Sequence, residues 1–322
     1  MNDMIQERHP ISSDLARRMK RGKVVSMDEA VHVIRNGDTV AFGGFVGCGF
    51  AEGIAKEIER QFIEQGRPRE LTIIYSAGIG DGKEKGLNHL AHEGLVNCVI
   101  GGHWGLVPKL QKLAIENKIE AYNLPQGVIS HMLRDIAAHN PRTISKVGLG
   151  TFVDPRHGGG KINERTTEDI VELLSFDGEE CLAYKPRPIQ VAVLRGTTAD
   201  LDGNITMERE ALTVDSLSIA MAAKNSGGVV MVQVERIADR GTLRARDVKI
   251  PDILVDCVVV ADPEDHWMTF AEKYNPAYSG ETRVPVTSLE PLPLDERKII
   301  ARRASLELKV NSVVNLGIGV PE

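Results

Sequence analysis

Residues 36–49 combine the residue types that bind an anion through the main chain. They read Asn-Gly-Asp-Thr-Val-Ala-Phe-Gly-Gly-Phe-Val-Gly-Cys-Gly, so a short apolar strand at 39–42 runs into a glycine-rich loop, and a helical pattern at 51–61 follows. Glycine lets a ligand come close to the backbone, and the first turn of a helix offers unpaired N–H groups. The stretch suits an anion, or an oxyanion that forms during a reaction, although such loops also serve only as tight turns.

The spacing of these glycines excludes the two common nucleotide-binding motifs. After Gly47 and Gly49, a dinucleotide fingerprint needs glycine at position 52, but Glu52 stands there and Gly53 comes one residue late. A triphosphate-binding loop needs lysine directly after its last glycine, whereas Gly49 is followed by Phe50. Neither nucleotide motif fits.

Three more apolar strands run into loops that can join the same site. Strands expected at 71–75 and 96–100 lead into the glycine-rich loops 77–82 and 101–105, and 121–127 reads as a short strand with its loop. Further buried strands are expected at 189–195, 228–234 and 253–260, and helices at 109–117, 130–138 and 215–224. This alternation of apolar strands and helices predicts an α/β fold with a largely parallel sheet covered by helices on both faces. Ligands in such sheets bind beyond the carboxyl ends of the strands, where these loops gather.

Polar side chains in these loops are candidates for substrate contact. His103 follows a strand directly and, together with Trp104, either lines a pocket or packs within its loop. Gln126 places a side-chain amide donor at another strand end. In the glycine-dense segment 157–163, Lys161 and Asn163 either contact an anionic group of the substrate or belong to a surface excursion.

Two other patterns resemble metal sites without completing one. His89 and His92 lie three residues apart on one expected helical face, but no third ligand of suitable spacing accompanies them. Asp200 and Asp202 resemble part of a calcium loop that no glutamate completes. We therefore predict surface histidines, a β-turn and no bound metal.

Composition places the chain among folded proteins. Its length of 322 residues is enough for two domains or one large α/β unit. Its residues are 42% hydrophobic and 26% charged, which is typical of a folded globular protein. A net charge of −6 argues against a nucleic-acid surface. No apolar run reaches the eighteen or so residues of a membrane helix, and no signal peptide is evident. Four widely spaced cysteines are typical of reduced core thiols, so we expect a cytoplasmic protein without a membrane partner.

Four segments are predicted along the chain. They are a polar amino-terminal arm at 1–22, a first half at 23–274, a proline-rich linker at 275–293 and the beginning of a second half at 294–322. The second half opens with a helix from Asp295 to Lys309 and a strand over 312–316, which lead into Gly317-Ile318-Gly319. This repeats the order of helix, strand and glycine pair seen at 31–51, so two halves of related design are implied.

With these features together, the sequence resembles the family I coenzyme A transferases, most closely the bacterial short-chain acyl type with both halves on one polypeptide. The resemblance covers about residues 23–322, and it departs from the usual pattern at Ala51, where proline is common. Five blocks carry it in order: 43–45 (Gly-Gly-Phe), 101–104 (Gly-Gly-His-Trp), 122–127 (Tyr-Asn-Leu-Pro-Gln-Gly), 150–156 (Gly-Thr-Phe-Val-Asp-Pro-Arg) and 315–319 (Asn-Leu-Gly-Ile-Gly).

The resemblance implies ping-pong catalysis through a glutamyl-CoA thioester. An acyl-CoA and a short-chain carboxylate are then the substrates, with no metal or redox cofactor, since the coenzyme A thioester is itself a substrate. A homo-oligomer and a role in short-chain fatty acid or ketone-body metabolism are also implied. Substrate contacts are expected from Gly43, Gly44, Phe45, Gly47, His103, Gln126, Lys161 and Asn163.

The catalytic glutamate is expected downstream of this chain. In the family it follows the Gly-Ile-Gly loop in a Glu-x-Gly-x-x-Gly-Gly setting, and Glu322 lacks that setting. The chain is therefore expected to be the amino-terminal part of a longer enzyme, to need its remaining second half and to be inactive alone. Two alternatives stay open: a non-catalytic or isomerase-like relative that binds ligands with the same loops, and a scaffold or regulatory subunit paired with a separate catalytic chain.

Overall fold

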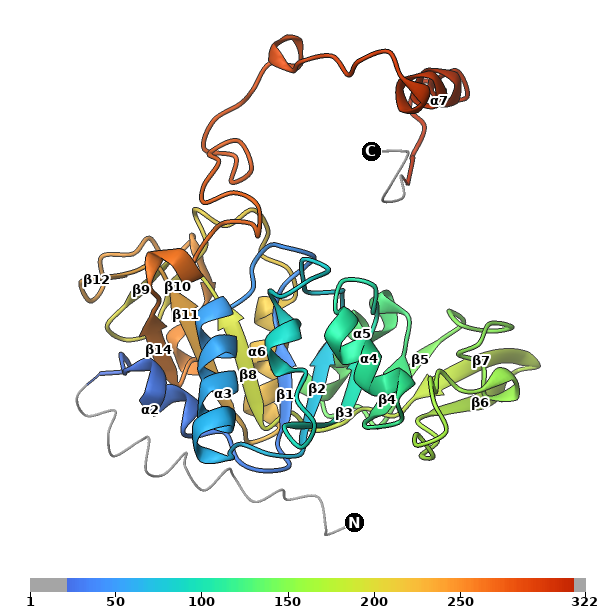
Figure 1. Cartoon of the computed structure of the whole chain (residues 1–322), viewed down its shortest axis with the longest axis horizontal. Coiled ribbons are helices and arrows are strands. Elements are labelled where there is room, and N and C mark those ends of the chain that lie inside the picture. Colours follow the sequence, from blue (N-terminus) through green and yellow to red (C-terminus); the bar gives the residue numbers. More distant parts are fainter. Residues whose placement is uncertain (1–21, 316–322) are drawn as a thin grey trace. The chain divides into compact units, whose positions relative to one another are not determined.

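The computed structural model describes residues 22–315, which form two units, one ending at Glu281 and one beginning at Thr282 (Figure 1). The first unit is built on a seven-stranded sheet in the order β14-β11-β8-β1-β2-β3-β4, and every neighbouring pair in it is parallel. The strands are β1 (Thr39–Phe42), β2 (Leu71–Tyr75), β3 (Val96–Gly101), β4 (Glu120–Asn123), β8 (Val191–Arg195), β11 (Val229–Val234) and β14 (Cys257–Val260). The predicted α/β fold with a largely parallel sheet is confirmed.

The order of strands reverses direction at β1. From β1 the chain builds outward through β2, β3 and β4, and it then returns to the other side of β1 to build β8, β11 and β14. In sheets of this kind, the crevice for a ligand forms at such a reversal, beyond the carboxyl ends of the strands. Residues 43–49, here called the glycine loop, follow β1 at this point.

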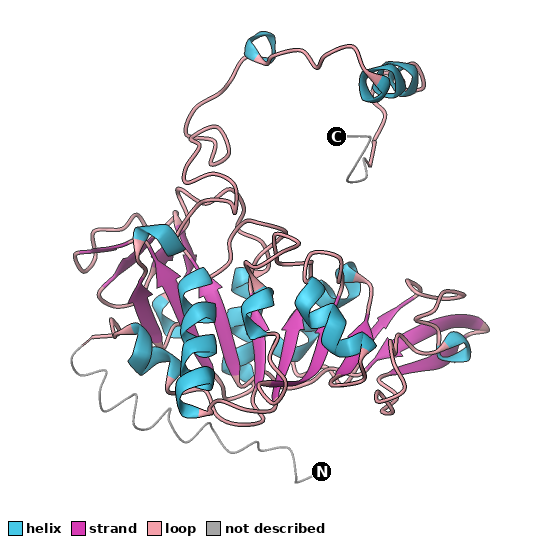
Figure 2. Ribbon diagram, viewed as in Figure 1, coloured by secondary structure: helices cyan, strands magenta, loops and turns pink. Residues whose placement is uncertain are grey.

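Helices cover both faces of this sheet, as Figure 2 shows. On one face lie α2 (Met27–Val31), α3 (Glu52–Gln65), the 3₁₀ helix η2 (Leu87–Leu90) and α4 (Pro108–Ile115). On the other face α5 (Gln126–Ala137) packs against α6 (Ser216–Asn225). Strand residues alternate between the two cores: in β1, Val40 and Phe42 face the first and Ala41 the second. Because both faces are buried, the strands read as continuous apolar runs in the sequence.

Two smaller sheets, which were not predicted from the sequence, extend the first unit. One contains β5 (Thr143–Ser145), β7 (Glu179–Tyr184) and β6 (Val171–Phe176); the other contains β12 (Arg236–Ala238), β9 (Thr198–Asp200), β10 (Ile205–Thr206) and β13 (Val248–Ile250). The β6–β7 hairpin turns at Asp177-Gly178, a dipeptide that is a strong hairpin signal. Asp200 likewise accepts bonds from the N–H groups of Asp202 and Asn204, which confirms the predicted turn there.

Several predicted helix limits were wrong by a few residues. α3 continues to Gln65 instead of ending at Gln61, and α4 begins at Pro108. The helix predicted from Ser130 begins four residues earlier, at Gln126, because Pro125 stands at its N-cap and its carbonyl accepts the Val128 N–H at 2.9 Å. Gln126 therefore opens a helix instead of lying in a loop.

The second unit contains one α-helix among its described residues. α7 (Glu296–Ser305) is capped by Asp295, as predicted, but it ends before Lys309 and has no buried side chain. The short 3₁₀ helix η6 (Val286–Ser288) lies in the predicted linker. Residues 312–315 form no strand, which contradicts that part of the prediction, and 316–322 lie outside the described residues, as does most of the predicted arm at 1–22.

Candidate active site

The glycine loop is hydrogen-bonded to the loop that follows β2. The N–H of Val46 donates to the carbonyl of Gly78 at 2.9 Å, and the N–H of Gly80 donates to the carbonyl of Val46 at 3.0 Å. Gly44 lies against the side chain of Ile79, and a Cβ on Gly44 would stand 3.2 Å from it. The two strand-end loops therefore meet as predicted from the topology.

The glycine loop holds a strained residue at its tip. Phe45 and Cys48 exchange two main-chain hydrogen bonds of 2.9 Å, which close a tight turn over Val46 and Gly47. Val46 has φ 55°, a conformation that a β-branched residue rarely adopts. Such strain persists only where the surroundings enforce it, and it concentrates at functional sites. Here the two bonds to the β2 loop hold Val46 in place.

This turn leaves main-chain donors available for a ligand. Among residues 22–315, the N–H groups of Gly44 and Gly47 have no hydrogen-bond partner. Both glycines are partly exposed, and the Phe45 ring between them is exposed. Gly44 and Gly47 can therefore donate hydrogen bonds to an anion. The N–H groups of the other two predicted residues are used by the fold: buried Gly43 donates to the Val193 carbonyl at 3.0 Å, and Phe45 donates to Cys48.

The side chain of His103 is exposed beside the same group of loops, whereas the side chain of Trp104 is buried. The exposed His103 side chain covers Gly78, where an added Cβ would stand 2.5 Å from its Nδ1 atom. Trp104 is 7% exposed, and its Nε1 donates to the Tyr122 carbonyl at 3.3 Å. Trp104 is thus part of the core, and of the predicted pair only His103 is open to a ligand.

Gln126 is exposed at the first turn of α5, beside the loop after β3. A Cβ on Gly102 would stand 3.0 Å from the Gln126 Cα and 2.0 Å from the carbonyl oxygen of Ser76. Gly102 therefore lets three strand ends approach one another. Within the described part of the chain, the side-chain amide of Gln126 has no hydrogen-bond partner, so it is free to donate to a substrate.

Lys161 lies beside β4, and its charge is paired. Its main chain bridges to Tyr122, and its ammonium group bonds the carboxylate of Asp169. The adjacent Gly160 carbonyl accepts the Asn123 N–H at 2.8 Å, close to the end of β4. Lys161 reaches a ligand only by leaving Asp169, an exposed partner.

Asn163 lies at the opposite end of β4 and is used by the fold. Its Nδ2 donates to the carbonyls of Ala114 at 2.6 Å and Ile119 at 2.9 Å, before β4 begins. Its Oδ1 accepts from the N–H and the hydroxyl of Thr166. With these contacts the amide serves to join α4 to the segment after the glycine-dense loop, so we do not include Asn163 among the proposed substrate contacts.

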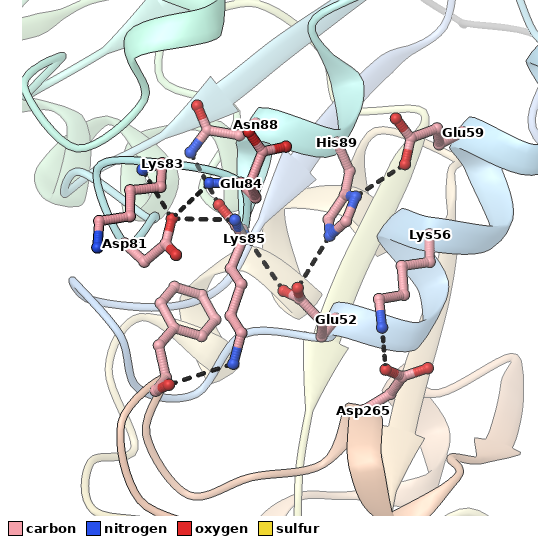
Figure 3. A network of polar contacts seen from close by, with 12 residues as sticks. Glu52, Lys56, Glu59, Asp81, Lys83, Glu84, Lys85, Asn88, His89 and Asp265 are labelled. Atoms are coloured by element: carbon pink, nitrogen blue, oxygen red, sulfur yellow. Dashed lines mark hydrogen bonds and ion pairs between the residues drawn. The ribbon is translucent and has the colours of Figure 1, made fainter.

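A chain of carboxylates and imidazoles locks α3 to the segment after the β2 loop (Figure 3). His89 Nε2 lies 2.9 Å from Glu52, and its Nδ1 lies 2.8 Å from Glu59, which also contacts His92 at 2.7 Å. Glu52 accepts the Gly86 N–H at 3.0 Å as well. Both histidines are therefore partly buried and hydrogen-bonded to carboxylates, and they are not on the surface as predicted.

The two carboxylates favour the charged form of His89. Burial alone lowers the pKa of this imidazole, but hydrogen bonds and charges from Glu52 and Glu59 more than offset burial and raise the pKa. Both ring nitrogens face acceptors, as suits an imidazolium. No group of histidine, cysteine, aspartate or glutamate side chains within residues 22–315 is arranged to hold a metal ion.

A buried ion pair beside the glycine loop was missed by the sequence analysis. Arg195 ends β8, and its Nε lies 3.0 Å from the carboxylate of Glu210; both side chains are almost fully buried. The one signal in the sequence was a charged residue that ends an otherwise apolar strand. Charges at such depth are rare unless they are paired.

Lys85 also went unnoticed. Its ammonium group lies 4.6 Å from the centre of the Trp267 ring and donates to the Phe270 carbonyl at 3.2 Å. It ties the β2 loop to residues 266–270, which we call the strap.

Among the described residues, no helix is long and apolar enough to cross a membrane.

The chain is similar throughout the first unit to enzymes that transfer coenzyme A. The family model described as Coenzyme A transferase matches residues 24–261. Caffeate CoA-transferase of Acetobacterium woodii is 48% identical over 300 residues, which cover 93% of this chain and 57% of that protein. Acetate CoA-transferase YdiF of Escherichia coli K12 is 41% identical over 304 residues, which cover 94% of this chain and 57% of that protein.

Solved structures show the same likeness. Crystal structures of the acyl-CoA transferase YdiF from Escherichia coli O157:H7 superpose with TM-scores of 0.87 for the apoenzyme and 0.86 for a thioester complex with CoA. Both are 41% identical to this chain, of which 93% is covered, against 57% of theirs. The chain thus spans a little over half the length of these relatives.

Proposed function

Because this chain belongs to the coenzyme A transferase family, we propose that the protein containing it moves coenzyme A between a short-chain acyl-CoA and a free carboxylate. The observation that carries the proposal is the cluster of open donors where the strand order reverses. The N–H groups of Gly44 and Gly47 lie at this reversal, and the amide of Gln126 lies farther along the same edge of the sheet, after β4. The thioester complex with CoA described for YdiF supports an acyl-CoA substrate.

The proposed chemistry uses a glutamate that lies beyond residue 322. Its carboxylate attacks the thioester carbon of the acyl-CoA, expels the CoA thiolate and forms an acyl-glutamyl anhydride. The thiolate then attacks the glutamyl carbonyl, expels the acyl group as a carboxylate and leaves a glutamyl-CoA thioester. An incoming carboxylate reverses both steps, so no metal or redox cofactor takes part.

Residues of this chain are proposed to stabilise the oxyanions that form in these steps. Each attack puts negative charge on a carbonyl oxygen, and fixed donors in a site shielded from water stabilise that charge at little cost of reorganisation. The Gln126 amide and the glycine-loop N–H groups are the donors that this chain offers. His103 and Phe45 are exposed beside them and are proposed to contact the acyl group. Lys161 is proposed to meet a carboxylate or a phosphate of CoA.

A labelling experiment on the full-length protein tests the proposal. Incubation with acetyl-CoA should add the mass of CoA, less water, to one glutamate, and borohydride or hydroxylamine should remove that adduct. Transfer of CoA to a labelled short-chain carboxylate should follow ping-pong kinetics. The residues 1–322 alone are proposed to be inactive, and the functional enzyme is proposed to be a homo-oligomer of the complete chain.

Failure of both assays would favour a ligand-binding relative without transferase activity. In that case the complete coding sequence should contain no glutamate in the expected glycine setting. Co-purification with a second polypeptide of roughly 200 residues, an ordinary domain size, would instead favour a subunit paired with a separate catalytic chain.

A further inference from the structure

The strap, residues 266–270, lies directly against the glycine loop. The N–H of Phe270 donates to the carbonyl of Gly47 at 3.0 Å, and Thr269 pairs with Cys48 in a β-bridge. A Cβ on Gly47 would stand 3.3 Å from both the ring and the backbone nitrogen of Phe270. The tip of the glycine loop is therefore held from two sides, by the β2 loop and by the strap.

Arg195 anchors the strap from the end of β8. Its Nη1 donates to the carbonyl of Trp267 at 2.6 Å and lies 3.5 Å from the carbonyl of Phe50, where the glycine loop leads into α3. Its Nη2 lies 3.5 Å from the carbonyl of His266. One buried guanidinium thus contacts the main chain of both segments.

Glu210 and His266 complete the surroundings of Arg195. Burial raises the pKa of the Glu210 carboxyl, but the charge of Arg195 and a contact with His266 more than offset burial and lower it. Burial and the neighbouring Arg195 lower the pKa of His266, whose Nδ1 accepts from Gln233 at 3.1 Å. A neutral imidazole beside a paired carboxylate leaves the guanidinium free to bind carbonyl groups.

We infer that Arg195 is a positioning residue, which fixes the strap and through it the main-chain donors of the glycine loop. The inference rests on the proposed function, because it gives those donors a role in transition-state stabilisation. Val46 is strained, so the turn keeps its shape only while outside bonds hold it. Without Arg195, the strap loses its buried anchor at Trp267, while Lys85 still holds the strap and the β2 loop still holds the turn. The bond from Phe270 to the Gly47 carbonyl is then no longer fixed in one position, and the Gly47 N–H shifts.

The expected kinetic signature is a lower kcat at an unchanged KM. Donors that act on the oxyanion contribute in the transition state and not in the ground state, so their misplacement lowers kcat and kcat/KM together. Misplacement by about 1 Å can cost on the order of a hundredfold in rate. A residue that only stabilised the fold would lower the amount of active protein without changing kcat per folded molecule.

The test uses the full-length protein and five variants, one of which, W267F, serves only to assign a resonance. R195M leaves Glu210 buried without its partner, which can prevent folding, so the double variant R195M/E210M removes both charges and is expected to fold. R195K retains a cation and should recover part of the rate. The control R187M removes an arginine that is paired with Glu168 before β8 begins, away from the strap.

Two readouts separate the inference from the proposed function. kcat and KM are measured for acetyl-CoA, and 5-fluorotryptophan NMR follows Trp267, whose resonance is assigned with W267F. We expect R195M/E210M to lower kcat 10- to 100-fold per folded molecule with KM within about twofold, and to shift or broaden the Trp267 resonance. R187M should change neither.

A double variant with wild-type kcat, or with an unchanged Trp267 resonance, would overturn the inference. Absence of CoA transfer by the wild-type protein would instead overturn the proposed function and, with it, the role of Arg195 in transfer. In that case the Trp267 resonance would still report whether Arg195 anchors the strap.

Discussion

The N–H of Val46 donates to the carbonyl oxygen of Gly78 at 2.9 Å, so two strand-end loops continue the pairing of their strands. β1 and β2 are parallel neighbours, and beyond their last paired residues Val46 and Ile79 form a further parallel bridge. The floor of the candidate site is therefore an extension of the sheet. This explains how a segment rich in glycine can hold donors in fixed positions.

Substitution of Gly102 should separate the loop after β3 from α5. In G102A the new methyl group meets the carbonyl oxygen of Ser76, a backbone atom that cannot turn away. We expect a loss of about 1–3 kcal/mol in the free energy of unfolding and roughly a 10- to 100-fold lower kcat/KM. The matched control is G127A, where nothing lies within 4 Å of an added Cβ; a similar loss in both variants would contradict the packing described.

Removal of the Gln126 amide should slow catalysis without weakening the fold. Its side chain is exposed and has no partner among residues 22–315, so Q126A breaks no internal contact. Loss of an oxyanion donor typically costs on the order of 100-fold in kcat. We expect such a loss in CoA transfer, with a melting temperature equal to wild type. Q111A, at an exposed position on α4, is the control, and equal rates for the two variants would exclude Gln126 as a donor.

His89 should make stability depend on pH. Its pKa is raised in the folded state, so its contribution is fully present below the unfolded pKa of about 6.5 and is lost as pH rises through the folded value. We therefore expect H89Q to melt well below wild type at pH 5.5–6 and the gap to narrow toward pH 9. Melting curves across this range provide the measurement, with H131Q, at an exposed position on α5, as control. A gap that widens with pH would contradict the ion pairs.

Asn163 should matter for stability and not for substrate affinity. N163A removes an amide that donates to the carbonyls of Ala114 and Ile119. The same amide accepts hydrogen bonds from the N–H and the hydroxyl of Thr166. We expect about 1–3 kcal/mol less free energy of unfolding. KM values for acyl-CoA and carboxylate should match those of wild type. A raised KM with unchanged stability would return Asn163 to the substrate site; N140A, at an exposed position, is the control.

The main sheet could be predicted because its signal is local. β1 and β2 were placed at their observed limits, since buried strands of a parallel sheet stand out as short apolar runs between glycine-rich turns. The family resemblance, drawn from five short blocks of sequence, is confirmed by the match over residues 24–261. Both results follow from features that lie close together in the sequence.

Other features depend on contacts between distant residues and could not be read from the sequence. Arg195 is a useful anchor only because Trp267 and Phe50 come to lie beside it in the fold. Asn163 looked suited to a ligand because its segment is rich in glycine, but α4 uses its amide. The strain at Val46 was hidden because valine in a glycine-rich loop gives no sign of its φ angle.

The position of β1 between β2 and β8 has a consequence for how the protein is made. β8 begins at Val191, about 150 residues after β1 ends at Phe42, a length that takes roughly 7–30 s to synthesise on a ribosome. Until then β1 has a neighbour on one side only, and a bare strand edge is a template for pairing with other chains. The strand at the centre of the finished sheet is thus an edge strand during translation, and the nascent chain is most exposed to misassembly in that interval.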